Sequence, residues 1–369
     1  MTSDPKAVQR TALYDAHVAS GARMIPFGGF DMPVQYSSIL KEHEAVRRRA
    51  GLFDLSHMGQ YLLEGENVAN WAEALTVNAI ESMKPLQARY NLFTNERGGV
   101  HDDVIFYRLD GRWLLVVNAG NAVKMWEHLQ KNLGSSGVKL TNLHGKNALI
   151  AIQGPKSLEM LQGHVTADLA ALKYYFCTEG SAFGKRAVIA RTGYTGEDGF
   201  ELFVDGADAP EIWRACLAAN ASQGLEPAGL GARDVLRLEA GMPLYGHEIT
   251  EEITPLQAGL NWAVKFSKPQ FRGKAALQAQ AAADDFRRIA GLVMAGRAPA
   301  REGYKVFLGS REVGEVRSGS TAPSVENKNV ATALLEKAAA TPGTVLTVEI
   351  RGNKHEAMVV PLPFYKRGA

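Results

Sequence analysis

The change in the character of the chain near residue 285 constrains its fold more than any other feature of the sequence. Before this point, helical and strand-like spacings of apolar residues alternate, which is typical of a mixed α and β architecture. After it, short apolar runs are separated by Gly-rich turns, and we expect strands over 289–294, 304–308, 312–317 and 345–351. This pattern predicts a small β-barrel or sandwich at the C-terminal end.

Local signals place a hairpin, several further strands and a series of helices before residue 285. Asp110-Gly111 lies between apolar runs over 104–109 and 113–118, and this dipeptide is a strong hairpin signal. Spacing and flanking glycines predict the other elements. These are one helix with the face Val68, Trp71, Ala72 and Leu75, one with the face Val123, Trp126, Leu129 and Leu133, one over 232–240, and strands over 148–153, 186–191 and 200–204.

The composition is that of a globular protein and makes several classes of function improbable. Hydrophobic residues make up 46% of the chain, and 41 basic against 39 acidic residues give a net charge of +2. This balance gives no reason to expect a nucleic-acid partner or a basic membrane-binding surface. Cys177 and Cys216 are too few for a disulfide framework, so we expect buried thiols in a reducing compartment.

The sequence also lacks the signals of membrane insertion and of metal chemistry. No apolar run reaches the ~18 residues of a membrane helix. No leader-like segment begins the chain, so we expect a cytoplasmic protein, or a mitochondrial matrix protein if a presequence has been removed. No Gly-Lys pair is followed by Ser or Thr, and Glu251 holds the place of the second zincin histidine after His247-Glu248. We therefore expect no membrane contact and no metal.

A Gly-Gly turn followed by two aspartates is the first candidate site. Residues 98–107 leave this turn as a strand, and alternation puts Asp103, Ile105 and Tyr107 on one face and Asp102 on the other. A carboxylate beside an aliphatic and an aromatic side chain, at the entry of a strand, is typical of a small pocket. The alternative is that the two aspartates only cap the turn.

The Gly-rich segment 191–201 is the second candidate site. Its three glycines permit backbone conformations that let a ligand approach closely. The segment leads into a strand whose first polar residue is Glu201. A carboxylate can accept two parallel hydrogen bonds from an edge such as the ring N–H and amino group of a pterin or guanine. The alternative is a plain Gly-rich hairpin.

Three further features have a functional and a structural interpretation. Arg233 and Arg237 share a helical face, which suits an anionic or carbonyl-rich ligand or ordinary surface ion pairs. His57 is a candidate general base, but we rank a structural hydrogen-bond partner higher. The run Arg47–Arg49 at a helix end is interpreted as a solvated face, with the docking of an acidic partner as the less favoured alternative.

Six segments, in order along the chain, together resemble one protein family. The match extends from about Thr11 to Phe364, nearly the whole chain. The segments are Thr11–Tyr14, Pro33–Tyr36, Phe53–Met58, Gly98–Asp103, Gly193–Glu201 and Ala232–Gly241. They are similar to those of the aminomethyltransferase, or T protein, of the glycine cleavage system.

The resemblance implies an α+β fold with three domains arranged as a cloverleaf around a central folate site. A split first domain would comprise residues 1–52 and 138–250, an inserted α+β domain residues 53–137, and a C-terminal β-barrel domain with its linker residues 251–369. It also implies that Asp103 is the catalytic acid/base group. The implied folate-binding residues are Met58, Tyr90, Ile105, Tyr107, Asn118, Phe176, Tyr194, Glu201, Arg233, Tyr245 and Trp262.

The activity that the resemblance implies is transfer of an aminomethyl group from the lipoyl arm of H protein to tetrahydrofolate. The products would be 5,10-methylenetetrahydrofolate, ammonia and dihydrolipoyl H protein. Two alternatives stay open. A folate-dependent demethylase would use the same pocket residues. An iron–sulfur accessory protein of the same scaffold would carry a Lys-Gly-Cys-Tyr-type motif, and neither Cys177 nor Cys216 lies in that context.

Overall fold

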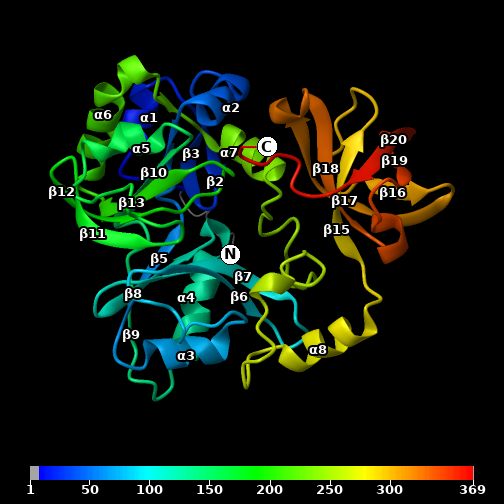
Figure 1. Ribbon diagram of the computed structural model, residues 1–369, viewed down its shortest axis with the longest axis horizontal. Coiled ribbons are helices and arrows are strands. Elements are labelled where there is room, and N and C mark those ends of the chain that lie inside the picture. The colour runs from blue at the N-terminus through cyan, green and yellow to red at the C-terminus, as the bar shows by residue number, and fades with distance from the viewer. Residues whose placement is uncertain (1–7, 369) are drawn as a thin grey trace, which may run out of the picture.

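The chain folds into three lobes, which Figure 1 shows around a common centre. The structure is a computed structural model that describes residues 8–368. Two lobes are sheets covered by helices, and the third is a closed barrel at the C-terminal end. The predicted α+β fold with a C-terminal barrel is therefore confirmed.

The first lobe contains a six-stranded mixed sheet with the strand order β11-β12-β13-β10-β4-β14, in which only the β14–β4 pair is parallel. Its strands are β4 (Gly51–Asp54), β10 (Asn147–Gln153), β11 (Cys177–Ala182), β12 (Lys185–Ala190), β13 (Gly199–Asp205) and β14 (Glu226–Pro227). Its helices are α1 (Tyr14–Ala19), α2 (Ile39–Arg48), α5 (Ser157–Gln162), α6 (Ala209–Ala219) and α7 (Leu230–Glu239). Beside them lies a small sheet of β1 (Gln9–Arg10), β2 (Arg23–Phe27) and β3 (Phe30–Gln35).

The second lobe contains an antiparallel sheet with the strand order β6-β7-β8-β5-β9. Its elements are β5 (Gly59–Glu64), α3 (Val68–Leu75), β6 (Ala88–Thr94), β7 (Val100–Arg108), β8 (Arg112–Val117), α4 (Ala122–Lys131) and β9 (Lys139–Asn142). The β7–β8 hairpin turns at Asp110-Gly111, as predicted, and Gly111 takes a φ of +65°. The domain boundaries stay a prediction; β9 pairs with β5, just beyond the predicted boundary at residue 138.

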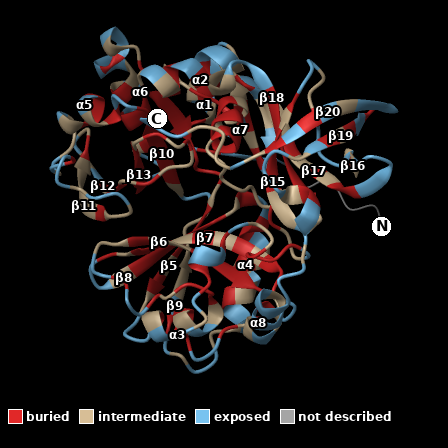
Figure 2. Cartoon of the chain, turned by 45° about the vertical axis from the view of Figure 1, so that its right-hand side comes forward, coloured by how far each residue is buried: buried red, intermediate tan, exposed pale blue. Residues whose placement is uncertain are grey.

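The third lobe is a closed barrel with the strand order β15-β18-β17-β16-β19-β20. Its strands are β15 (Arg288–Met294), β16 (Lys305–Leu308), β17 (Arg311–Ala322), β18 (Lys328–Leu335), β19 (Val345–Ile350) and β20 (Asn353–Val360). Figure 2 shows that the buried residues lie mainly in the interior of each lobe. Each lobe therefore has its own apolar core. The four predicted barrel strands are present, while β18 and β20 complete the closure.

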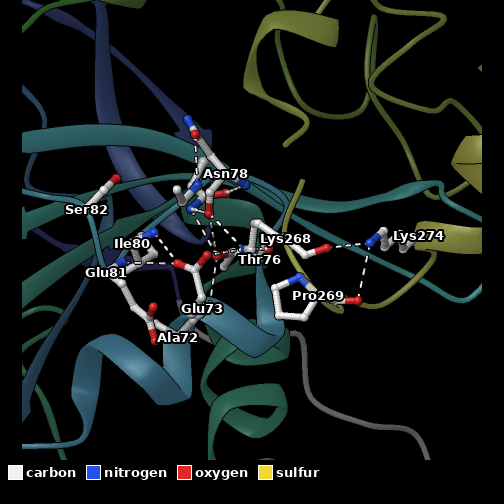
Figure 3. A network of polar contacts seen from close by, with 12 residues as sticks. Ala72, Glu73, Thr76, Asn78, Ile80, Glu81, Ser82, Lys268, Pro269 and Lys274 are labelled. Atoms are coloured by element: carbon white, nitrogen blue, oxygen red, sulfur yellow. Dashed lines mark hydrogen bonds and ion pairs between the residues drawn. The ribbon is translucent and has the colours of Figure 1, made fainter. Parts of the chain in front are cut away.

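A long segment that includes α8 (Lys274–Ala283) connects the first lobe to the barrel and crosses the second lobe on the way. Figure 3 shows how Lys268 anchors it there. Lys268 is 4% exposed; its ammonium donates to the carbonyl oxygens of Thr76 and Asn78 and lies 3.4 Å from a carboxylate oxygen of Glu73. These partners satisfy a buried charge and attach the connecting segment to the second lobe at Lys268.

The prediction that Arg47–Arg49 form a solvated face is wrong for Arg47. Arg48 is 73% exposed, as predicted, but the side chain of Arg47 is only 8% exposed and forms ion pairs of 2.8 Å with Glu197 and with Glu239. The guanidinium of Arg47 also lies 4.0 Å from the ring centroid of Tyr365. Arg47 therefore joins α2, the Gly-rich turn, α7 and the C-terminal tail inside the protein.

Two predictions about the wider chain can also be compared with the structure. No helix within residues 8–368 is both long and apolar enough to cross a membrane. Cys177 and Cys216 are free thiols and both are buried, in agreement with the expectation of small apolar side chains.

Candidate active site

A cavity of about 790 Å³ lies where the lobes meet. Its walls come from the β2–β3 hairpin, the 55–58 loop between β4 and β5, strands β6 and β7, helix α7, the connecting segment and the barrel strand β17. A cavity built from so many elements exists only after the lobes have packed together. Its size is in the range that small-molecule ligands occupy.

The structure brings eleven of the twelve predicted site residues together around this cavity. They are Met58, Tyr90, Asp103, Ile105, Tyr107, Asn118, Tyr194, Glu201, Arg233, Tyr245 and Trp262. Their sequence positions span more than 200 residues. Shared lining of one cavity is a structural fact, whereas their individual roles stay predictions.

Phe176 is the predicted site residue that does not line the cavity; its neighbour Tyr175 does. Tyr175 has a φ of +60°, which changes the direction of the chain at this point. The backbone of Phe176 then forms a bridge with Gln87 at the contact between the first and second lobes. We therefore replace Phe176 by Tyr175 as the aromatic residue of this wall.

Asp103 reaches the cavity from β7, and Asp102 lies behind the cavity wall. The predicted alternation is thus correct. The Asn118 amide donates to Oδ1 of Asp103 at 2.6 Å, and the Tyr90 hydroxyl donates to Oδ2 at 3.2 Å. Burial raises the pKa of Asp103 above its ordinary value. A carboxylate held in this way can accept a proton near neutral pH or balance a positive charge.

The Gly98-Gly99 turn is required by close backbone packing. Gly98 has a φ of +84°, and a Cβ on Gly99 would lie 1.8 Å from the backbone oxygen of Glu251 in the connecting segment. The same segment accepts a hydrogen bond from Val100 through the carbonyl of Thr250, at 2.8 Å. The two glycines therefore set how closely the segment approaches the start of β7, where Asp103 lies.

We expect Gly99→Ala to lower the free energy of unfolding by about 2 kcal/mol or more, because the Glu251 backbone must move away. Urea unfolding of wild type and variant measures this difference. Gly163→Ala is the control, since a Cβ at Gly163 meets no atom within 4 Å, and its effect should be about 0.5 kcal/mol or less. Equal stabilities of the two variants would contradict the packing argument.

Glu201 stands in β13, paired with Ala151 of β10, and its carboxylate is almost fully buried at the cavity. The hydroxyls of Tyr107 and Thr192 both donate to Oε2, the former at 3.1 Å. No described residue donates to Oε1. One oxygen of Glu201 is therefore fixed by the protein, and the other is left for a donor on a ligand.

Aromatic rings cover much of the remaining wall. The ring centroids of Tyr90 and Trp262 are 5.6 Å apart, and Trp262 is 55% exposed. Tyr107 packs edge-on against Phe203 with centroids 5.0 Å apart. Flat apolar surfaces of this kind suit a planar ring system in a ligand.

The two arginines of α7 have different environments. Arg237 is buried and binds Asp234, Glu248 and the Ser318 hydroxyl of the barrel at 2.8–2.9 Å. Arg233 forms no ion pair with any described residue and lies at the cavity, 4.7 Å from the ring centroid of Tyr194. Both side chains line the cavity, but only Arg233 retains a cation that a ligand can use.

Our preferred interpretation of His57, as a structural hydrogen-bond partner, is wrong for its ring. Its ring lines the cavity, its Nδ1 is enclosed, and within residues 8–368 no group bonds to the ring. Its backbone oxygen alone accepts a hydrogen bond, from His144 at 3.2 Å. Burial, with Arg233 nearby, lowers the pKa of His57, so the ring is neutral near pH 7.

Sequence reasoning missed the β2–β3 hairpin as part of the site. Its tip residues Phe27 and Gly28 line the cavity, and a Cβ on Gly28 would lie 2.6 Å from Cβ of Ala119 in the second lobe. The Gly28-Gly29 pair was an available turn signal. Arg301 and Arg317 of the barrel also line the cavity, and nothing local in the sequence marks them.

The chain matches family models over almost its whole length. Residues 13–268 match the GCVT N-terminal domain, and residues 287–366 match the glycine cleavage T-protein C-terminal barrel domain. The boundary between the two matches falls at the end of the connecting segment. The models therefore separate the barrel from the two sheet lobes, as the structure does.

Similar proteins are known in sequence and in structure. The chain is 46% identical to the aminomethyltransferase of Moorella thermoacetica over 98% of both chains, and 45% identical to that of Deinococcus deserti over 99% of both. A crystal structure of the glycine cleavage system aminomethyltransferase T from Bartonella henselae superposes with a TM-score of 0.91 at 34% identity, covering 98% of this chain and 99% of that one. This chain is therefore an enzyme of the glycine cleavage T-protein family, the aminomethyltransferases.

Proposed function

We propose that this enzyme transfers an aminomethyl group from the lipoyl arm of H protein to tetrahydrofolate. The aminomethyl carbon starts between the sulfur of the arm and an amino nitrogen. Its bonds to sulfur and to that nitrogen break, and it forms bonds to two folate nitrogens. One folate N–H proton leaves with the ammonia and the other with the dihydrolipoyl thiol, so that the product is 5,10-methylenetetrahydrofolate.

In this proposal Asp103 handles the proton of the attacking nitrogen. When an amine nitrogen forms a new bond to carbon it becomes positively charged, and a nearby carboxylate stabilises that charge and accepts the proton. The hydrogen bonds from Asn118 and Tyr90 hold the carboxylate in one position at the cavity. No nucleophilic side chain is required.

Glu201 and Arg233 would orient the pterin ring. The free Oε1 of Glu201 suits the N–H and amino edge of the pterin, and the neighbouring ring carbonyl suits the unpaired guanidinium of Arg233. Tyr90, Tyr107 and Trp262 would cover the ring system and exclude water, which would otherwise hydrolyse the electrophilic carbon. These assignments go beyond family membership, because they propose which substrate the cavity binds.

The observation that carries the proposal is the presence of a positioned carboxylate, Asp103, and a second carboxylate with a free oxygen, Glu201, in one aromatic-walled cavity. The decisive experiment incubates the purified enzyme with aminomethylated H protein and measures ammonia. We expect release only when tetrahydrofolate is added. Ammonia release at the same rate with and without tetrahydrofolate would refute the proposal.

The same experiment separates the alternatives. A demethylase on this scaffold would instead consume a sulfonium or a methylated amine, and an iron–sulfur accessory protein would turn over neither substrate. No contact among the described residues around the cavity favours either of them. The enzyme's proposed location is the cytoplasm, or the matrix if this is a processed mitochondrial chain.

We expect turnover to need no metal ion. Within residues 8–368 no group of three or more His, Cys, Asp or Glu side chains is arranged to hold one, and the proposed proton transfers need only Asp103. The measurement is kcat after exhaustive dialysis against a chelator. Unchanged kcat is the expected result, whereas full loss that a single metal restores would overturn the mechanism.

A further inference from the structure

Asp102, which does not line the cavity, is linked to Asp103 through a shared amide. The side-chain nitrogen of Asn118 lies 2.9 Å from Oδ1 of Asp102 and 2.6 Å from Oδ1 of Asp103. The backbone N–H of Asn118 donates to Oδ2 of Asp102 at 3.2 Å, and the Asn121 amide donates to Oδ1 at 2.6 Å. Asp102 is 0% exposed. The side-chain amide of Asn118 therefore contacts two carboxylates, that of Asp103 at the cavity and that of Asp102 behind its wall.

We propose that Asp102 is a positioning residue that acts through Asn118 to fix the carboxylate of Asp103. This inference rests on the proposed function, in which Asp103 is the reacting carboxylate. Asn118 donates directly to Oδ1 of Asp103, and Asp102 holds Asn118 from behind.

The hydrogen count of the amide supports this role. A carboxamide nitrogen has two N–H groups. One of them binds Oδ1 of Asp102, so the other is directed at Asp103, where it meets Oδ1 and, at 3.1 Å, the backbone oxygen. Without the first contact the amide can rotate about its side-chain bond, and the donor to Asp103 is no longer fixed.

The surroundings of Asp102 leave it few other functions. All three hydrogen bonds of its carboxylate come from Asn118 and Asn121, at the end of β8 and in the turn before α4. It forms no ion pair with any described residue. Burial raises the pKa of Asp102, and the neighbouring Asp103 raises it further. A buried side chain whose hydrogen bonds are all accepted from these two asparagines is suited to orient Asn118.

The first test compares two substitutions of Asp102. Asp102→Ala removes every acceptor, and we expect kcat to fall about tenfold while KM for tetrahydrofolate changes less than about threefold, because Asp103 is misplaced and the folate walls are intact. Asp102→Asn keeps one acceptor oxygen and should restore kcat to within about threefold of wild type. Asn121→Ala, which removes the other donor to Asp102, should lower kcat in the same direction by a smaller factor.

A double-mutant cycle then asks whether Asp102 acts through Asn118. In an Asn118→Ala background, Asp102→Ala should change kcat less than about twofold, since the linking amide is already gone. Glu239→Gln is the matched control. It is a fully buried carboxylate bonded to His43, Arg47 and Ser324, outside the cavity, so any factor it contributes should be the same in both backgrounds.

A crystal structure of Asp102→Ala gives a readout that does not depend on the reaction. We expect the Asn118 nitrogen to have moved beyond hydrogen-bond distance of Oδ1 of Asp103. An Asn118 amide that stays in place, or a full Asp102→Ala effect in the Asn118→Ala background, would overturn the inference. Absence of tetrahydrofolate-dependent ammonia release by the wild type would instead count against the proposed function alone.

Discussion

Asp103→Asn should lower kcat by ~100-fold or more while tetrahydrofolate still binds, because the substitution keeps the size of the side chain and removes its ability to take a proton. The carboxamide can still accept the hydrogen bond that Asn118 donates to Oδ1. It cannot balance the positive charge that develops on the attacking nitrogen. The measurement is kcat at saturating tetrahydrofolate, with the folate dissociation constant determined separately.

Asp102→Asn is the control for this prediction. It makes the same chemical change one residue away, behind the cavity wall, and should cost far less turnover. An inactive Asp102→Asn enzyme beside an active Asp103→Asn enzyme would show that the wrong carboxylate has been assigned to the reaction.

The pH dependence of kcat gives the same prediction a second readout. Asp103 must be ionised to accept a proton, so activity is lost as the pH falls through its pKa. Burial raises the pKa of Asp103, so this loss should occur at higher pH than the value of ~4 at which an ordinary aspartate titrates. The residual activity of Asp103→Asn should lack this acidic limb. A wild-type limb at the ordinary value would contradict the buried, proton-accepting role.

Glu201→Gln should weaken tetrahydrofolate binding by about 1.5–3 kcal/mol, or about tenfold to 150-fold in Kd. The hydroxyls of Tyr107 and Thr192 occupy Oε2 and favour an oxygen at that position. The new amide nitrogen then replaces the free Oε1 and presents a donor to the donor edge of the pterin. Titration calorimetry with tetrahydrofolate measures the difference.

Glu211→Gln on the exposed side of α6 is the control and should leave the folate Kd unchanged. Unfolding midpoints of both variants exclude a general loss of stability. If Glu201→Gln bound tetrahydrofolate as tightly as wild type, Glu201 would be only the first polar residue of a strand.

Local structure could be predicted from the sequence where periodicity and turn chemistry agree. The face Val68, Trp71 and Ala72 of α3 is buried as expected, and the Asp110-Gly111 hairpin forms. The helix α4 is also present, but its buried face is Ala122, Met125 and Leu129, and Val123 is 64% exposed. Spacing alone allowed either face, and the position of the neighbouring sheet selected one.

The strand β18 marks a second limit of local reasoning. Every residue of β18 after Lys328 is buried, because Ala331, Ala333 and Leu335 pack in the barrel core while Val330, on the other face, packs with Leu238 of α7. A strand enclosed in this way lacks the alternation of apolar and polar residues that identifies strands in a sequence. Its assignment required knowledge that the barrel closes.

By itself the sequence determined many of the local elements, a barrel or sandwich at the C-terminal end, the alternation that separates Asp102 from Asp103, and, through its motifs, the family and most of the candidate site. These depend on residues close to one another in the chain. The tertiary structure decided what depends on contacts between distant segments: that Tyr175 rather than Phe176 faces the cavity, that the side chain of Arg47 is almost enclosed, and that the ring of His57 has no hydrogen-bond partner among the described residues. Burial and hydrogen bonding are properties of the packed lobes, so no local pattern could specify them.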